Sequence, residues 1–128
     1  MILDSSAIVA LALQESGAEH ILEKLDASEL NAIGAPTLLE TSIVLQARLG
    51  DAGREFLDNF IDGFRVEVHP FTRQHWATAR DAFLRFGKGR HPAGLNYGDC
   101  MSYAVAKLAG RRLLFVGEDF RRTDIEAA

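Results

Sequence analysis

The sequence predicts an α/β fold in which a central parallel sheet of four or five short strands is flanked by helices. Hydrophobic segments typical of strands alternate along the chain with segments of helical periodicity. Two predicted strands, Met1–Leu3 and Leu113–Val116, lack a polar face, as strands covered by helices on both sides do. The length of 128 residues, 48% of them hydrophobic, fits one domain over residues 1–128.

The first half of the chain alternates between predicted strands and helices. In order, these are a strand at Met1–Leu3, a helix at Ala7–Leu13, a helix with apolar residues from Ala18 to Leu25, a strand at Leu30–Ile33 and a helix at Thr37–Leu49. The polar turn Asp4-Ser5-Ser6 precedes the first helix, and Pro36 suits the first turn of the third helix. This order begins the alternation that a parallel sheet requires.

The second half continues the alternation. It contains a helix around the apolar stripe from Phe56 to Phe64, a strand at Val66–His69, a helix from the cap Thr72 to Phe86, a helix from Asn96 to Ala109 and the strand Leu113–Val116. Gly87 is expected to end the fifth helix. We expect Trp76 and the phenylalanines to pack in the core rather than to stack on bases.

Four acidic residues are predicted to meet at one edge of the sheet. Asp4 directly follows the first strand and Asp119 follows the last, and ligands of parallel sheets bind beyond the carboxyl ends of strands. Glu40 lies among apolar residues of the third helix, where an uncompensated carboxylate is unfavourable. Asp99 lies in the first turn of the sixth helix and can reach the same crevice.

Close carboxylates point to a bound cation, because ionising all of them together is strongly disfavoured without one. Hard oxygen ligands favour Mg²⁺, or Mn²⁺, over zinc. Such ions polarise a phosphate and generate a hydroxide nucleophile, which is a recurring solution to phosphodiester hydrolysis. The four acids therefore predict a metal-dependent nuclease site.

Each acid also has a purely structural interpretation. Asp4 can cap the first helix, and Asp99 can form a capping box with Asn96. Glu40 can form a buried ion pair with an arginine such as Arg80. The joint pattern, rather than any one residue, carries the functional prediction.

The acidic motifs resemble those of PIN domains. The length of the chain and its Tyr97-Gly98-Asp99 segment resemble those of VapC, the toxin of bacterial type II toxin–antitoxin pairs. The matching segments are Asp4-Ser5-Ser6-Ala7, Leu38-Leu39-Glu40-Thr41, Asn96-Tyr97-Gly98-Asp99 and Gly117-Glu118-Asp119-Phe120. This resemblance implies a PIN domain that is an Mg²⁺-dependent endoribonuclease. It implies Asp4, Glu40, Asp99 and Asp119 as catalytic residues that hold the metal, with Asp4 and Asp99 as its ligands, and Ser6 as a polar neighbour that assists substrate binding.

The fourth acid departs from the family pattern, because Glu118 stands beside Asp119 and Asp124 lies close by. Asp119 is also a residue type common in turns after strands. Glu118 and Asp119 are therefore both candidates for the fourth acid.

A basic loop precedes the Asp99 motif. The segment Arg85–His91 contains Arg85, Lys88 and Arg90 and no acid, and its glycines allow a phosphate to approach closely. We expect Lys88 and Arg90 to bind the RNA backbone, with a solvated loop as the alternative, and His91 is a further candidate for RNA contact. The net charge of −4 argues against a protein that coats nucleic acid through its overall field.

Localisation and partners follow from composition and resemblance. No apolar run approaches the length of a membrane span, so we expect a cytoplasmic protein without a membrane partner, whose single Cys100 is a reduced, buried thiol. The resemblance implies an RNA substrate, a homodimer and a VapB-like antitoxin. It also implies that operator DNA is bound only through this antitoxin. The apolar residues of the early helices are the expected antitoxin surface: Leu11, Leu13, Ile21, Leu22 and Leu25. The alternatives are a catalytically silent PIN-like interaction domain and a PIN nuclease that cleaves DNA.

Overall fold

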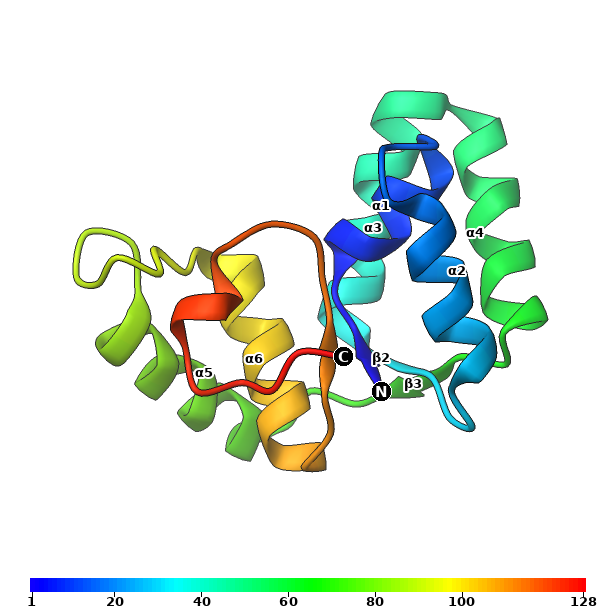
Figure 1. Cartoon of the computed structure of the whole chain (residues 1–128). Coiled ribbons are helices and arrows are strands. Elements are labelled where there is room, and N and C mark those ends of the chain that lie inside the picture. The colour runs from blue at the N-terminus through cyan, green and yellow to red at the C-terminus, as the bar shows by residue number, and fades with distance from the viewer.

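A four-stranded parallel sheet runs through the centre of the computed structural model, which describes all 128 residues (Figure 1). The strands lie in the order β3-β2-β1-β4 and span Ile2–Leu3 (β1), Ala32–Gly34 (β2), Glu67–His69 (β3) and Leu113–Leu114 (β4). In register, Ile2 pairs with Ala32 on one side and with Leu113 on the other. The predicted fold class is confirmed.

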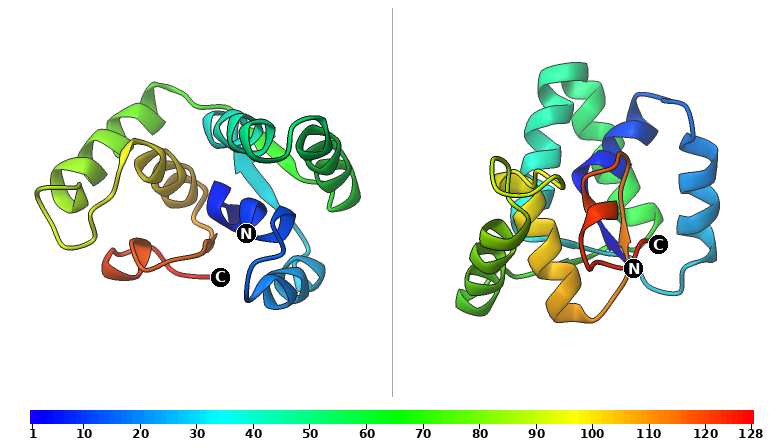
Figure 2. Two further views of the ribbon diagram at one scale, coloured as in Figure 1. Left: turned by 90° about the horizontal axis from the view of Figure 1, so that it is seen from above. Right: turned by 60° about the vertical axis from the view of Figure 1, so that its left-hand side comes forward.

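The strands β1, β2 and β4 are buried on both faces, as their hydrophobicity predicts, whereas the edge strand β3 is largely exposed. Leu3, Ile33 and Leu114 face a core cluster that also contains residues of α1, α2, α3 and α4. Ile2, Ala32 and Leu113 face a second cluster with α5 and α6. The left view of Figure 2 shows the two groups of helices on opposite sides of the strands.

Six α-helices and one 3-10 helix surround the sheet. Their bounds are Ser5–Ala12 (α1), Ala18–Ala27 (α2), Ala35–Leu49 (α3), Asp51–Gly63 (α4), Arg73–Phe86 (α5), Tyr97–Ala109 (α6) and Phe120–Arg122 (η1). Thr72 is the N-cap of α5, as predicted, and Pro36 lies in the first turn of α3. Gly17 breaks the chain between α1 and α2 with a φ of 92°, a conformation that glycine adopts without strain.

All four strands are shorter than predicted, and β1 and β3 each begin one residue later than expected. The strand β2 begins at Ala32 rather than Leu30, and β4 ends at Leu114 because Phe115 and Val116 leave the sheet toward α1. There the Val116 N–H donates to Ser6 Oγ over 3.0 Å instead of to a strand. The C-terminal tail lies beside β4 through an isolated parallel bridge between Leu113 and Ala127.

Two expectations about exposed and buried apolar residues are wrong. Of the five residues expected to form an antitoxin surface, Leu11, Ile21 and Leu25 are core residues and offer no docking surface, Leu13 is partly buried, and Leu22 is exposed. Trp76 is half exposed, and the guanidinium of Arg80 stacks on its ring at 4.5 Å from the centroid. Helical periodicity identifies an apolar face but does not say whether another element covers it. None of the helices has the length and apolar character needed to cross a membrane.

Candidate active site

Asp4 lies at the carboxyl end of β1, where its side chain is buried and both carboxylate oxygens accept hydrogen bonds. Its Oδ2 accepts from the backbone N–H of Ser6 at 3.0 Å and from Ser6 Oγ at 2.6 Å. Its Oδ1 accepts from Ser102 Oγ of α6 at 2.6 Å. The predicted helix cap is confirmed, and the same contacts fix the direction of a carboxylate that is 4% exposed.

Hydroxyl groups hold this carboxylate between three elements. Ser6 Oγ also accepts from the N–H of Val116, which joins the start of α1 to the end of β4. Ser102 Oγ lies 3.2 Å from Thr37 Oγ1 of α3, and both side chains are buried. Sequence reasoning missed Ser102 and Thr37, although a serine within the apolar run of α6 was a signal. Substrate binding by Ser6 stays a prediction.

Glu40 projects from α3 against the first turn of α6. A Cβ atom on residue 98 would overlap the Glu40 carboxylate, so this approach requires Gly98. Glu40 forms no ion pair, and Arg80 stacks on Trp76 instead. The structural interpretation of Glu40 as the partner of Arg80 is therefore wrong.

Asp99 lies in the first turn of α6 and forms the predicted capping box with Asn96. Its Oδ2 accepts from the Asn96 N–H at 3.0 Å, and its own N–H donates to Asn96 Oδ1 at 2.9 Å. Burial raises the pKa of Asp99 to about 6, against the effect of the Asn96 N–H. The charges of Asp4, Asp119 and Glu40 raise that pKa further, so the four predicted acids share one electrostatic environment.

The three acids near the end of β4 have different surroundings. Asp119 is exposed, forms no ion pair and directly precedes η1. Glu118 pairs with Arg121 at 3.3 Å and is not among the charges that raise the pKa of Asp99. Asp124 is bound to Tyr103 and Lys107. Of the candidates for the fourth acid, Asp119 is the one whose charge acts on Asp99.

The acids gather without forming a closed ligand cage. No group of three or more histidine, cysteine, aspartate or glutamate side chains lies close enough together to enclose one ion. Their donor atoms are nevertheless all carboxylate oxygens, the type that Mg²⁺ and Mn²⁺ prefer. The proximity that raises the pKa of Asp99 also disfavours adding further negative charge without a cation.

The basic loop presents two free cations rather than three. Gly87 pairs with Leu95 in an isolated bridge, and Lys88 and Arg90 are exposed between them without ion pairs. Arg85 instead faces Asp81 at 3.8 Å and Asp124 at 3.4 Å. Figure 1 shows the loop at the left, leading into the first turn of α6 that carries Asp99.

The surroundings of two other reactive side chains, Cys100 and His91, indicate structural roles. Cys100 is buried, as predicted, and burial raises the pKa of its thiol to about 11, which disfavours the reactive thiolate form. His91 Nδ1 accepts from the N–H of Ala93 at 3.0 Å, and its ring meets the Phe86 ring edge-on. His91 therefore has a role in shaping the basic loop.

Comparison with known proteins identifies relatives of nearly equal length. The PIN domain family model matches residues 1–126. VapC ribonuclease Mb0640 of Mycobacterium bovis is 42% identical over 98% of this chain and 95% of its own length. Ribonuclease VapC of Mycolicibacterium smegmatis is also 42% identical, over 99% of this chain and 98% of its own.

Solved structures share the fold at low sequence identity. VapC20 of Mycobacterium tuberculosis, described as a toxin that cleaves the sarcin-ricin loop, superposes with a TM-score of 0.80 at 17% identity over 99% of this chain and 97% of its own. A chain of the VapBC2 complex of Rickettsia felis, solved with a DNA fragment from its promoter, gives a TM-score of 0.76 at 16% identity over 98% and 94%. At such identities the structures establish the fold alone.

Proposed function

The chain belongs to the PIN-domain family, and within it to the VapC ribonucleases, and we propose that it cleaves RNA through Asp4, Glu40, Asp99 and Asp119 with Mg²⁺ or Mn²⁺. One observation carries the assignment of the site. The charges of the other three acids, at the carboxyl edge of the sheet, raise the pKa of the Asp99 carboxyl group. Residues that lie 20 to 95 positions from Asp99 in the chain thus act on its carboxyl group.

Asp4 and Asp99 are the proposed direct metal ligands, with Glu40 and Asp119 completing the negative pocket. When bound, the ion polarises the scissile phosphate and activates water for in-line attack. The protein's own contribution is to fix the acceptors. Ser6 and Ser102 orient Asp4, Asn96 orients Asp99, and Gly98 admits the Glu40 carboxylate.

Lys88 and Arg90 are proposed to bind the RNA backbone beside this pocket. They are exposed and unpaired, whereas the pocket itself is acidic and repels phosphate. The two cations therefore supply the local attraction that a net charge of −4 denies to the whole surface. The protein is expected to act in the cytoplasm, where its substrate is found.

A VapB-like antitoxin is the proposed partner, and operator DNA is bound only through it. The structural neighbours support this, since one is a VapBC2 complex with promoter DNA and another is a toxin–antitoxin complex from Klebsiella pneumoniae. The negative charges of the four acids would pair with an arginine or lysine side chain of an antitoxin. We expect expression alone to arrest growth and co-expression of an adjacent small protein to restore it.

A homodimer is also proposed, through apolar side chains that the monomer leaves exposed on α3, α5 and the start of α6. Leu39 and Ile43 are 62% and 61% exposed one turn apart on α3, and Tyr97 is 81% exposed. Trp76, Phe83 and Tyr97 line one groove with a volume of about 380 Å³. Light scattering should give the mass of a dimer, and Trp76→Glu with Tyr97→Glu should give that of a monomer.

Incubation of purified protein with labelled RNA and with single-stranded DNA tests the proposed reaction. We expect cleavage of RNA in Mg²⁺ or Mn²⁺, none in EDTA and none of DNA. Cleavage of both polymers would indicate a nuclease that ignores the 2′-OH, and cleavage of neither would favour a silent interaction domain.

A further inference from the structure

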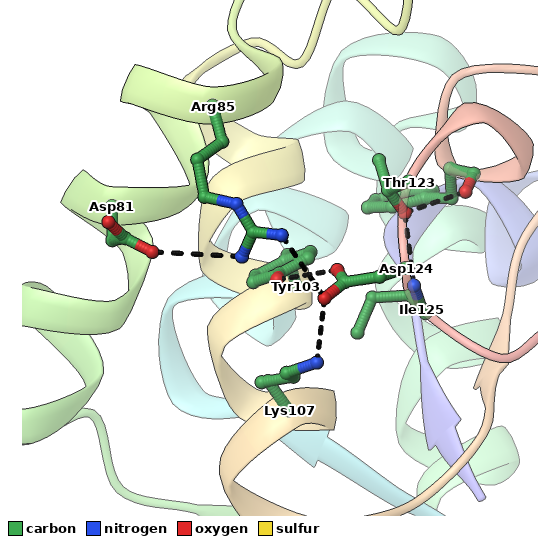
Figure 3. Close-up of polar contacts among 8 residues, drawn as sticks. Asp81, Arg85, Tyr103, Lys107, Thr123, Asp124 and Ile125 are labelled. Atoms are coloured by element: carbon green, nitrogen blue, oxygen red, sulfur yellow. Dashed lines mark hydrogen bonds and ion pairs between the residues drawn. The ribbon is translucent and has the colours of Figure 1, made fainter.

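Asp124, in the C-terminal tail, accepts hydrogen bonds from two helices at once (Figure 3). Its Oδ1 accepts from Tyr103 Oη of α6 at 2.7 Å, and its Oδ2 accepts from Lys107 Nζ of α6 at 2.9 Å. Arg85 Nη2, in the last turn of α5, donates to the same Oδ2 at 3.4 Å. Arg85 also faces Asp81 one turn earlier on α5.

This network favours the ionised form of Asp124. Burial alone would raise the pKa of Asp124, but the hydrogen bonds from Lys107 and Tyr103 and the nearby positive charges outweigh it and lower the pKa to about 2. The Tyr103 ring is buried in the core, so its hydroxyl is a fixed donor. Charge-assisted bonds from such donors are stronger than neutral ones.

The segment between Asp119 and Asp124 is short and internally bonded. The Phe120 ring of η1 is buried and packs against Phe115 with 5.1 Å between centroids. Thr123 Oγ1 donates to the Phe120 carbonyl at 2.7 Å and accepts from the Ile125 N–H at 3.2 Å. Fixing Asp124 therefore restricts the position of Asp119, which starts this segment.

The same network reaches the basic loop. Arg85 precedes Lys88 by three residues, so holding its side chain fixes the end of α5 from which the loop departs. On the other side of the loop, Arg122 of η1 donates to the Pro92 carbonyl at 3.5 Å. Asp124 thus connects the segment that carries the fourth acid with the base of the loop that carries Lys88 and Arg90.

We infer that Asp124 is a positioning residue, which acts through Tyr103, Lys107 and Arg85 to hold Asp119 and the basic loop at the acidic site. The inference rests on the proposed function, because it gives Asp119 a role in binding metal and the loop a role in binding RNA. Asp124 itself is bound to protein donors and takes no direct part in the chemistry.

The test uses Asp124→Asn and Tyr103→Phe in the full-length chain. The first removes the charge, and the second removes one donor while keeping the ring. Glu126→Gln is the matched control, because Glu126 lies in the same tail and pairs at 2.7 Å with Arg112 rather than with α5 or α6. Mn²⁺ affinity is measured from the electron paramagnetic resonance signal of free Mn²⁺, and KM for RNA is measured at saturating Mn²⁺.

We expect Asp124→Asn to weaken Mn²⁺ binding about 10-fold, the scale at which residues that orient metal ligands act, and to raise KM for RNA. Tyr103→Phe should shift both values in the same direction by less, and Glu126→Gln should leave both unchanged. A purely structural anchor would lower the unfolding midpoint without moving either value.

The inference is overturned if both folded variants bind Mn²⁺ and RNA as the wild type does. If Asp124→Asn does not fold at the assay temperature, Tyr103→Phe decides alone. A wild-type protein that neither binds Mn²⁺ nor cleaves RNA overturns the proposed function and this inference together. If the wild type binds Mn²⁺ and cleaves RNA and both variants match it, only this inference is overturned and the proposed function stands.

Discussion

Ser102 of α6 donates a 2.6 Å hydrogen bond to Asp4 Oδ1 and is the only side chain bonded to that oxygen. Because the carboxylate is buried, Ser102→Ala leaves one oxygen without a donor. We predict a loss of about 1–3 kcal/mol in the free energy of unfolding, measured in urea, together with slower RNA cleavage. Ser42→Ala is the control, since the Ser42 hydroxyl bonds only to the Leu38 carbonyl on its own helix. Equal effects of the two substitutions would argue against a special role for Ser102.

Gly98→Ala should displace the Glu40 carboxylate, since the new Cβ would overlap it. The far end of a glutamate moves easily, and alanine favours a helix by up to about 1 kcal/mol over glycine, so stability should change little. RNA cleavage should fall at least about 10-fold, as when a group that orients a metal site is lost. Gly63→Ala, at the end of α4 with open space around its Cβ position, should leave cleavage unchanged. Full activity of Gly98→Ala would remove Glu40 from the site.

The free energy of unfolding should depend on pH because the pKa of Asp99 is raised in the folded protein. The pKa of this residue is about 6 in the folded protein against a usual value of 3.8, so the folded state binds more protons between these values. Stability contributed by protonated Asp99 is therefore present below about pH 4 and is lost as the pH rises through 6. Urea unfolding of wild type and Asp99→Asn from pH 4 to 7 should show a difference that changes over this window. Parallel curves would contradict the raised pKa of Asp99, whose main cause is burial.

The sequence predicts the fold and the four acids for the same reason. Strands without a polar face must be buried on both sides; Asp4 directly follows one such strand, and Asp119 lies in the segment that leads from another, β4, to η1. The contacts that orient the site were not predictable in this way. Ser102 lies 98 residues from Asp4, and Arg85 lies 39 residues from Asp124. Local patterns do not specify such pairings, and they do not reveal that the apolar face of Trp76 lacks a covering element.

The identity of the fourth acid can be tested directly. Asp119→Asn should reduce RNA cleavage strongly, because Asp119 acts on Asp99, whereas Glu118→Gln should have a mild effect because Glu118 faces Arg121. Cleavage rates at saturating Mg²⁺ compare the two variants, which each lose one charge from adjacent positions. The reverse order of effects would move the site to Glu118.

Lys88→Ala combined with Arg90→Ala should weaken RNA binding and leave Mn²⁺ affinity nearly unchanged. Losing two phosphate contacts should reduce the slope of log affinity against log salt by about 1.4 for single-stranded RNA. Arg48→Ala with Arg54→Ala removes the same charge near the junction of α3 and α4, away from the acids, and should alter the slope little. Identical salt slopes for the two double variants would indicate that the basic loop is a solvated turn that does not bind RNA.

The most direct test of the metal-dependent site is the rate at which Asp4→Asn and Asp99→Asn cleave RNA under single-turnover conditions at saturating Mg²⁺. Asp58→Asn, an exposed acid of α4 without an ion pair, is the control. Both site variants should remain folded by circular dichroism, because asparagine retains an oxygen that can accept the capping hydrogen bonds. We predict that both lose cleavage while the control cleaves at the wild-type rate. Wild-type rates in folded Asp4→Asn and Asp99→Asn proteins would contradict the account.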